Sequence, residues 1–316
     1  MLISLIVPCY NEEESLPHLY NALCEVRDSE DCRDKTFEFI FVNDGSSDKT
    51  AELIREYASS DPCVRYVMFS RNFGKESAMY AGLQKAKGDY VAIMDADMQD
   101  PPSLTPDMIR SLDADECDIV AARRVTREGE PKIRSFFARA FYRLINRMCD
   151  VEIADGARDF RLMRRSVVDA ILKVTERQRF SKGIFAWVGF RTKWIEHVNT
   201  PRVAGETKWS FWKLFRYAID GIVAFTIAPL RLASIAGFIC AAAGFIYMIY
   251  YFIRAIILQI YNEVPGYPSL LCFILFIGGL ILMALGLIGE YVGRTYIETK
   301  ARPIYIASEE SEEEKS

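Results

Sequence analysis

Histidine is scarce in this chain of 316 residues, which contains only His18 and His197. The eight cysteines include no CxxC pair, so the usual zinc-ligand spacing is absent and a zinc site is disfavoured. Scattered, unpaired cysteines are typical of reduced thiols that face the cytosol. We interpret His197 as a surface or core residue rather than a catalyst.

An excess of positive charge is also missing. The net charge is −4 and the isoelectric point lies near 5.5, which disfavours a nucleic-acid partner. Neither GxGxxG nor GxxxxGK[ST] occurs, so the usual dinucleotide and P-loop modes of phosphate binding do not apply. The N-terminal run LISLIVP lacks a basic leader and is too short for a signal peptide, so we interpret it as a strand.

Long hydrophobic runs are present near the C-terminus, at residues 232–253 and 269–289. Each is long enough to cross a bilayer core of about 30 Å as a helix. We therefore predict a transmembrane hairpin over 231–293, with helices at about 232–257 and 269–290. An amphipathic helix at the membrane interface is expected over 209–230, because Trp and Phe alternate there with basic residues. Core packing is the alternative for that segment.

The basic residues around the hairpin predict its orientation. The loop 258–268 contains no Lys or Arg, whereas both outer flanks are basic. The positive-inside rule then places both termini in the cytoplasm, together with residues 1–208 and the tail 294–316, whose acidic end we expect to be disordered. Glycines in the second run permit close helix contacts and favour a homo-oligomer, a dimer or tetramer.

Residues 1–208 alternate short apolar runs with amphipathic helices of about 10 to 15 residues. This βαβ pattern predicts an α/β domain with a largely parallel sheet and helices on both faces. We read 155–164 as a polar insertion before a helix at 167–174, and 192–197 as an edge strand. The other expected strands cover residues 3–7, 37–42, 64–69, 90–94 and 118–122.

The segment YVAIMDADMQD predicts the chemical centre. The buried strand 90–94 ends at Asp95 and Asp97, and alternate residues of an extended chain point the same way. Their carboxylates, together with the amide oxygen of Gln99, suit Mg²⁺ or Mn²⁺ held partly by substrate phosphates. The carboxyl ends of parallel strands are also where α/β sheets bind ligands. A solvated acidic turn is the alternative.

Polar loops after the first two strands are expected at the same sheet edge, where a nucleotide can lie. These loops contain Tyr10, Asn11 and Glu12 and, after the second strand, Asp44. Asp44 is placed to accept from a base or ribose, and Lys75 to approach a phosphate. Ordinary turns are the alternative for each loop.

Basic side chains further along are candidates for anionic groups. Residues 123–147 form a basic amphipathic segment, and the loop 200–210 carries Arg202 and Lys208. Asp159 and Arg161 flank Phe160, and a structural Asp–Arg pair is the alternative there. A membrane anchor on a metal-binding α/β domain predicts transfer from a nucleotide-diphosphate donor to a lipid phosphate. Asp159 would then orient the sugar or stabilise positive charge at its anomeric carbon.

Five motifs stand out along the chain: IVPCYNEEESL, FVNDGSSDKT, DADMQDPP, ARDFRLM and TKWS. Together they resemble family 2 glycosyltransferases of the GT-A fold. The two C-terminal helices resemble polyprenyl-phosphate glycosyltransferases of the GtrB type, relatives of dolichol-phosphate mannose synthase. The resemblance implies an inverting, metal-dependent transfer that makes a β-linked lipid-phosphate sugar for the cell envelope. It also implies a multi-pass protein of the bacterial inner membrane with undecaprenyl phosphate as acceptor.

The resemblance assigns roles to residues. The nucleotide sugar would be bound by Pro8, Tyr10, Asn11, Glu12, Asp44, Ser46, Lys75, Asp95 and Ala96. The metal would be held by Asp95, Asp97 and Gln99, and the catalytic residues would be Asp159 and Asp97. The acceptor phosphate would be bound by Arg123, Arg134, Arg161, Arg202 and Lys208.

Some choices stay open at this point. A QxxRW segment, typical of processive synthases, is not supplied by residues 178–181, which disfavours a polymerase. UDP-glucose is the first choice of donor and UDP-N-acetylglucosamine the second, followed by GDP-mannose. Another membrane lipid as acceptor, or a non-catalytic membrane partner, are the competing readings.

Overall fold

The computed structural model describes residues 1–124, 157–197, 226, 228–253 and 267–311. The chain divides into two compact units, and each is described by itself. The first unit comprises Met1–Gly221 together with Arg302–Ser316, and the second comprises Ile222–Ala301. The residues after the second apolar helix therefore belong to the first unit.

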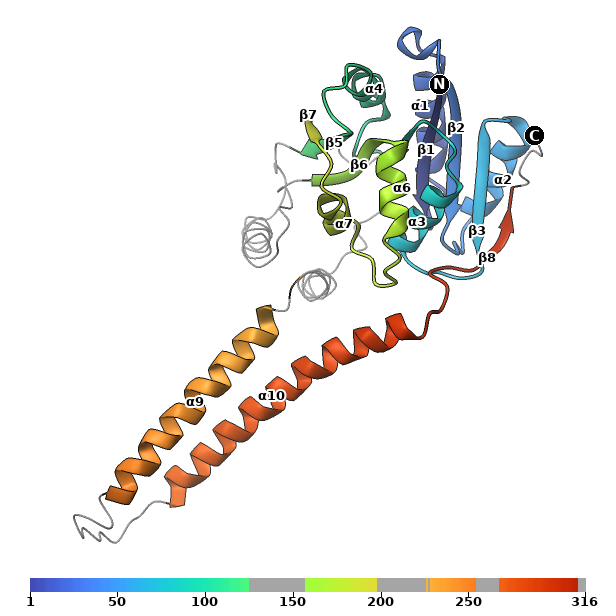
Figure 1. The fold of residues 1–316 in the computed structure, drawn as a ribbon. Helices are drawn as coiled ribbons and strands as arrows, with labels where there is room; N and C mark the ends of the chain where they lie inside the picture. Colours follow the sequence, from blue (N-terminus) through green and yellow to red (C-terminus); the bar gives the residue numbers. More distant parts are fainter. Residues whose placement is uncertain (125–156, 198–225, 227, 254–266, 312–316) are drawn as a thin grey trace. The chain divides into compact units, whose positions relative to one another are not determined.

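One eight-stranded sheet forms the centre of the first unit, in the order β7-β5-β6-β4-β1-β2-β3-β8 (Figure 1). The pairs β1–β2, β2–β3, β1–β4 and β5–β7 are parallel, whereas β6 runs antiparallel to β4 and β5, and β8 antiparallel to β3. The α/β class is confirmed, with a mixed sheet around a parallel centre. The strands are β1 Leu2–Cys9, β2 Thr36–Asn43, β3 Val64–Phe69, β4 Tyr90–Ile93, β5 Ile119–Arg124, β6 Ala157–Arg164, β7 Thr192–His197 and β8 Ala307–Glu310.

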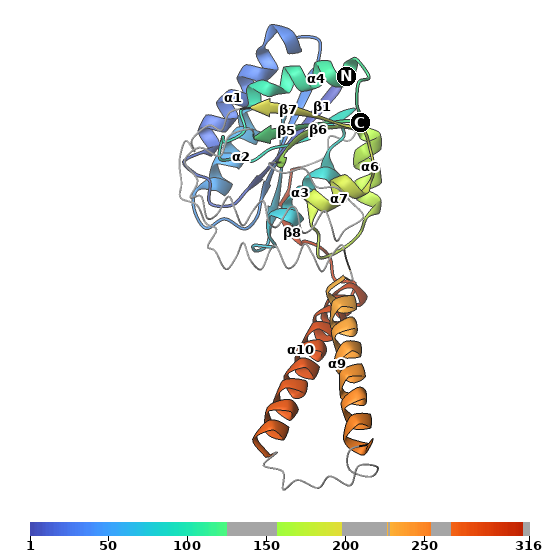
Figure 2. The same ribbon diagram turned by 90° about the vertical axis from the view of Figure 1, so that its left-hand side faces the viewer.

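Helices cover both faces of the sheet, as the alternating pattern predicts (Figure 2). The odd-numbered residues of β1 and β2, such as Phe39 and Phe41, pack in one buried cluster with residues of α1, α2 and α4. On the other face, Gly82 of α3 meets Ile6 so closely that an added Cβ would lie 2.2 Å from Ile6 Cγ2. The helices are α1 Leu16–Asp28, α2 Thr50–Ser60, α3 Lys75–Lys85, α4 Thr105–Asp113, α6 Arg165–Lys173 and α7 Ser181–Trp187, with short 3₁₀ turns η1 Glu30–Cys32 and η2 Pro102–Leu104.

The segment that we expected to be a polar insertion is strand β6, so that reading was wrong. Phe160 and Leu162 are fully buried in the core cluster, and Arg161 between them is 4% exposed. The alternation that marks a strand is present, but a buried arginine hides it, because charged residues are rarely buried. The strand inserts between β4 and β5, with Ile93 opposite Arg161.

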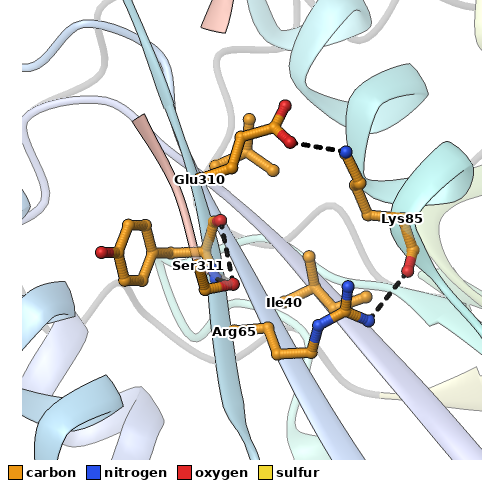
Figure 3. A pocket seen from close by; sticks show the side chains of 7 residues that line it. Ile40, Arg65, Lys85, Glu310 and Ser311 are labelled. Atoms are coloured by element: carbon orange, nitrogen blue, oxygen red, sulfur yellow. Dashed lines mark hydrogen bonds and ion pairs between the residues drawn. The ribbon is translucent and has the colours of Figure 1, made fainter. Parts of the chain in front are cut away.

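The tail also contains a strand that we did not expect, β8. Two of its four residues are glutamates, and basic or hydroxyl groups of the first unit bind them. Arg55 contacts both carboxylate oxygens of Glu309, at 3.1 and 3.2 Å from Nε, and Lys85 Nζ lies 2.6 Å from Glu310 (Figure 3). A small pocket beside β8 is lined by Ile40, Arg65, Tyr66, Val67, Lys85, Glu310 and Ser311. The acidic end, 312–316, lies outside the described residues.

The second unit contains helices α9 (Ala228–Phe252) and α10 (Tyr267–Thr299), which pack against each other. Both are long and apolar enough to cross a membrane, over Ala228–Tyr247 and Phe276–Thr299, and no part of either window is buried within the protein. The two expected spans are thus present as helices, although α10 continues beyond the predicted end. The expected interfacial helix falls mostly on 209–225, outside the described residues, and stays a prediction.

Candidate active site

The carboxyl ends of β1, β2 and β4 meet at one edge of the sheet because these strands are parallel. The loop after β1 is tied to the loop after β2. The side-chain oxygen of Asn11 accepts a hydrogen bond from the backbone N–H of Ser47 at 2.8 Å. The backbone N–H of Asn11 donates to Ser46 Oγ at 2.9 Å. Asn11 has a φ of 54°, a left-handed conformation that Asn tolerates better than most residues. The structure therefore brings together the two predicted nucleotide loops.

Other predicted nucleotide residues lie along these loops. The backbone N–H of Glu12 donates to Thr50 Oγ1 at 2.8 Å, which adds a second tie between the loops. Tyr10 is 40% exposed, whereas Pro8 is partly buried in β1 and Ala96 is buried after β4. The aromatic ring of Tyr10 is thus accessible to a ligand at this edge.

Asp44 is buried and holds the loop that leads into α3. Its carboxylate accepts from the backbone N–H of Phe73 at 2.6 Å and from that of Gly74 at 3.0 and 3.1 Å. Burial raises the pKa of Asp44, and these two backbone donors act against the rise. The next residue, Gly45, has a φ of 67°, and a Cβ there would lie 2.5 Å from the carbonyl carbon of Arg71. Glycine is therefore required for the two loops to approach.

Lys75, the first residue of α3, bridges two carboxylates. Its Nζ lies 2.5 Å from Asp95 Oδ1 and 2.5 Å from Asp159 Oδ2. Burial lowers the pKa of Lys75, but the charges of Asp159 and Asp95 outweigh that effect and raise it above its ordinary value. For Asp159, burial raises the pKa, but Lys75 and Lys182 outweigh it and hold the pKa well below its usual range. Both carboxylates are brought to one point, and Asp159 is ionised at neutral pH.

Strand β6 explains why Asp159 reaches this point. The antiparallel pairing sets Ile93, the last residue of β4, opposite Arg161, and extending this register by two residues brings Asp95 level with Asp159. Because β6 runs against β4, its first residues lie at the same edge as the carboxyl end of β4. The two aspartates are therefore neighbours across a strand pair although they are far apart in sequence.

A second polar group supports the loop after β4. Asp100 is 2% exposed, and Arg158 Nε lies 3.1 and 3.2 Å from its two carboxylate oxygens. Arg158 also donates to Gln99 Oε1 at 2.8 Å, and His197 Nε2 lies within ion-pairing distance of Asp100, at 2.9 Å. Burial raises the pKa of Asp100, against the lowering effect of Arg158. This group orients the turn that carries Asp97.

Sequence reasoning missed Arg158 and the contact of His197. Arg158 stands next to Asp159 in the alternating segment ARDFRLM, and reading that segment as a strand would have placed it at the site edge. His197 is buried, as one of the two interpretations of it expected, and it ends β7 at the same edge.

Comparison with known proteins identifies the family. The model of Glycosyl transferase family 2 matches residues 4–172, which is more than half of the chain. The chain belongs to glycosyl transferase family 2. The GtrB C-terminal hairpin matches residues 228–295. The resemblance inferred from the motifs is thereby confirmed.

Several curated relatives are similar to this glycosyltransferase over nearly their whole length. The prophage bactoprenol glucosyl transferase homolog of Escherichia coli K12 is 44% identical over 97% of this chain and 98% of its own. A bactoprenol glucosyl transferase of Shigella phage SfV is 42% identical over 99% of this chain and 100% of its own. A solved structure of glucosyl-3-phosphoglycerate synthase from Mycobacterium tuberculosis, in complex with Mn²⁺ and UDP-glucose, has a TM-score of 0.46 and 19% identity, and covers 70% of this chain and 77% of that one.

In this glycosyltransferase, Arg161 is only 4% exposed, and its assignment to the acceptor phosphate stays a prediction. Its guanidinium stacks over the ring of Phe185 at 3.6 Å and donates to the carbonyl oxygen of Arg158 at 2.8 Å. Burial lowers the pKa of Arg161 to about 10. The side chain packs against α7 through Phe185, and its hydrogen bond to Arg158 supports the backbone next to Asp159.

Of the other residues predicted to bind the acceptor phosphate, the structure describes only Arg123. Arg123 lies near the end of β5 and is partly buried. Arg134, Arg202 and Lys208 lie outside the described residues. Their assignment to the acceptor phosphate stays a prediction.

The donor set at the end of β4 fits a divalent cation that shares its ligands with a substrate. Asp95 and Asp97 present carboxylates, and Gln99 an amide oxygen, all of which are hard ligands. Asp97 Oδ1 also accepts from the backbone N–H of Gln99 at 3.2 Å, which keeps these groups on one turn. Among the described residues, three or more His, Cys, Asp or Glu side chains do not gather into a complete metal cage. A cation bound there would need further oxygens from a ligand such as a diphosphate.

Proposed function

We propose that this glycosyltransferase transfers glucose from UDP-glucose to a polyprenyl phosphate of the bactoprenol type, with inversion, to give a β-linked lipid-phosphate sugar. The observation that carries the proposal is the similarity to bactoprenol glucosyl transferases, which spans both the sheet domain and the helical hairpin. UDP-glucose follows from the sugar in those names and from the sequence-based preference for a UDP donor.

An acceptor that is confined to the membrane explains why the enzyme would carry a transmembrane hairpin. The reactive phosphate of a polyprenyl lipid stays at the bilayer surface, so an enzyme anchored there meets it without extraction from the membrane. Basic residues on both outer flanks of the hairpin support a cytoplasmic location of the sheet domain at the inner membrane of a bacterium. Nucleotide sugars are cytoplasmic substrates, which agrees with this orientation.

In the proposed complex, the nucleotide lies across the tied loops after β1 and β2. Tyr10 offers an accessible ring, and the buried carboxylate of Asp44 fixes the backbone of Phe73 and Gly74 beside it. The diphosphate then extends toward the end of β4. Asp95, Asp97 and Gln99 would hold Mg²⁺ or Mn²⁺ there, and the cation would offset charge that develops on the leaving diphosphate.

The protein's own groups have distinct tasks in the transfer step. The acceptor phosphate oxygen is anionic near neutral pH and attacks the anomeric carbon without a strong general base. Asp159, kept ionised by Lys75 and Lys182, is suited to stabilise positive charge on the reacting sugar or to orient it. Arg123, Arg134, Arg202 and Lys208 are proposed to hold the acceptor phosphate in line.

A transfer assay tests this proposal. Purified full-length protein is mixed with undecaprenyl phosphate, Mg²⁺ or Mn²⁺, and a panel of radiolabelled UDP- and GDP-sugars. We expect label from UDP-glucose to enter the organic phase, and Asp97→Ala to abolish it. Asp118→Ala, at the opposite end of the sheet, is the matched control and should retain activity.

The alternative outcomes are equally informative. Label from UDP-N-acetylglucosamine or GDP-mannose instead would overturn the choice of sugar. Label from no donor, by a folded protein that binds UDP, would overturn the polyprenyl acceptor and favour another membrane lipid.

A further inference from the structure

Lys75 contacts Asp95 as well as Asp159, and the proposed reaction does not yet use the contact with Asp95. Its ammonium lies 2.5 Å from an oxygen of Asp95 and 2.5 Å from an oxygen of Asp159. Asp95 is a proposed metal ligand, and Asp159 is the proposed residue at the reacting centre. One lysine therefore joins the two functional carboxylates.

The ammonium contacts Asp95, the carboxylate that the proposed cation would share with Asp97 and Gln99. Because both oxygens lie 2.5 Å from one nitrogen, they are at most about 5 Å apart. A Mg²⁺ ion binds oxygen at about 2.1 Å, so two oxygens on opposite sides of it are separated by about 4.2 Å. The ammonium and a divalent cation cannot both occupy the space between these carboxylates.

The side chain of Lys75 is able to move. It stands at the N-terminal end of α3, directly after Gly74, and its side chain is 41% exposed. The carboxylates are less exposed, at 23% for Asp95 and 16% for Asp159. The flexible lysine is thus the partner that can leave, while the carboxylates stay with their strands.

We propose that Lys75 is a tethered counter-cation, which bridges Asp95 and Asp159 when no divalent cation is bound and leaves Asp95 when a cation binds with the donor diphosphate. This inference rests on the proposed function for the identity of the metal and donor. The bridge keeps two neighbouring carboxylates from repelling each other in a partly buried site. It also opposes metal binding without nucleotide, because the ammonium then loses one of its two carboxylate partners without gaining the diphosphate as a new one.

Mn²⁺ binding to the full-length protein tests the competition directly. The free Mn²⁺ signal in electron paramagnetic resonance is titrated at fixed pH, without nucleotide, for wild type, Lys75→Met and Lys85→Met. Removal of one positive charge beside Asp95 is expected to tighten Mn²⁺ binding about tenfold or more. Lys85→Met is the matched control, because Lys85 is an ion-paired lysine at the other end of α3, and it should bind Mn²⁺ as wild type does.

Adding Asp95→Asn to Lys75→Met should remove the gain in affinity. The proposal is overturned if Lys75→Met binds Mn²⁺ no more tightly than wild type while its cooperative thermal unfolding is retained.

A measurement on the wild-type protein does not depend on the folding of a variant. Reductive methylation followed by mass spectrometry reports how accessible each lysine amine is. Saturating Mn²⁺ alone should increase the methylation rate of Lys75 severalfold and leave that of Lys85 unchanged. An equal or slower rate at Lys75 would contradict the displacement.

These readouts separate the two proposals. If the protein transfers no glucose in the lipid assay but Lys75→Met still tightens Mn²⁺ binding, the role of Lys75 stands and the proposed substrates fail. If the protein transfers glucose but Lys75→Met leaves the Mn²⁺ affinity unchanged, the proposed substrates stand and the role of Lys75 fails.

Discussion

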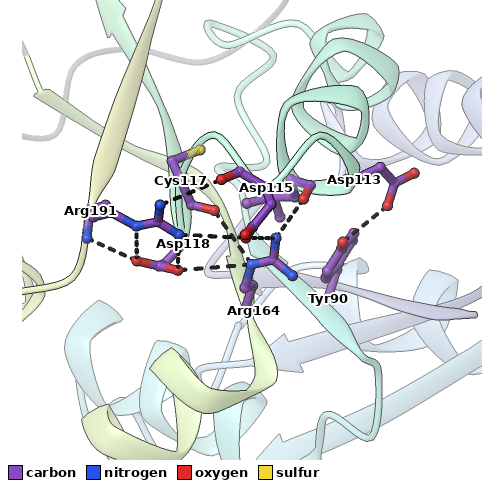
Figure 4. Close-up of polar contacts among 8 residues, drawn as sticks. Tyr90, Asp113, Asp115, Cys117, Asp118, Arg164 and Arg191 are labelled. Atoms are coloured by element: carbon purple, nitrogen blue, oxygen red, sulfur yellow. Dashed lines mark hydrogen bonds and ion pairs between the residues drawn. The ribbon is translucent and has the colours of Figure 1, made fainter.

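The paired strands β4 and β6 carry a charged cluster at each end, and the two clusters differ in how their charges are matched. At the site end, the single ammonium of Lys75 serves both Asp95 and Asp159. At the opposite end, two guanidinium groups meet two carboxylates (Figure 4). There, Arg191 binds Asp118 at 3.0 and 3.1 Å, and Arg164 binds Asp115 at 2.9 Å.

The two clusters also differ in burial. Arg191 and Asp115 are 59% and 76% exposed, so water screens their attraction and such pairs contribute little to stability. At the site end, Asp100 has a side chain that is only 1% exposed and relies on Arg158. The comparison teaches that the exposed cluster with matched charges joins loops, whereas at the site end one ammonium serves two carboxylates beside a buried ion pair.

The largest expected effect is a difference in catalytic activity between variants of the two charged clusters. Asp159→Asn should lower kcat for glucosyl transfer by about 100-fold or more, since it removes a charge placed at the reacting centre. Asp118→Asn, immediately before β5 at the opposite edge of the sheet, should change kcat less than about twofold. Steady-state transfer to undecaprenyl phosphate is the measurement. Similar losses of kcat in both variants would contradict a specific catalytic role for Asp159.

Removing an arginine from each cluster should separate the two ends by stability. Arg158→Ala removes the guanidinium that pairs with the buried carboxylate of Asp100, which costs about 3 kcal/mol and lowers Tm by roughly 6 to 12 °C. Arg191→Ala should cost clearly less than Arg158→Ala because its pairs are exposed and screened by water. Thermal unfolding of the full-length protein in detergent checks this order, and a larger loss in Arg191→Ala would contradict it.

Two glycines with positive φ give a matched pair of backbone tests. Gly45, at the site edge, has a φ of 67°, and a Cβ would lie 2.5 Å from backbone atoms of Arg71. Gly189, before β7, has a φ of 75°, and its nearest neighbour would be 4.0 Å away. Gly189→Ala should therefore cost only the conformational penalty of about 1 kcal/mol.

Gly45→Ala should cost more than about 2 kcal/mol and should also weaken UDP binding, because the loops 43–50 and 71–75 must move apart. Calorimetric titration with UDP and thermal unfolding provide the two readouts. Equal destabilisation in the two variants would show that the close approach at Gly45 is unimportant.

The smallest effect concerns acid stability at the exposed end. The hydrogen bonds from Arg191 lower the pKa of Asp118 in the folded protein. This contribution is complete above the unfolded pKa of about 3.9 and is lost as the pH falls through the lower folded value. The stability difference between wild type and Asp118→Asn should therefore be less than about 1 kcal/mol at pH 6 and should shrink below pH 4. A difference that grows in acid would have the wrong sign.

Strands and helices with a clear pattern were predictable. The runs at β1, β2, β3 and β4 are apolar and end in polar loops, so their position and the shared edge followed from periodicity and parallel topology. Strands β6 and β8 were not predictable in this way. In β6 the buried charge of Arg161 is stabilised by the ring of Phe185, and in β8 the charge of Glu309 is neutralised by Arg55. Both partners are distant in sequence, so a local pattern does not reveal them.

The sequence by itself determined which functional groups stand at strand ends, since an apolar run followed by Asp95 and Asp97 requires no knowledge of distant partners. It also determined the two apolar helices, whose length and composition are local properties. Only the tertiary structure decided that Asp159 faces Asp95 with Lys75 between them. That arrangement depends on the antiparallel register of β6 against β4, a pairing between segments about 70 residues apart that no local pattern specifies.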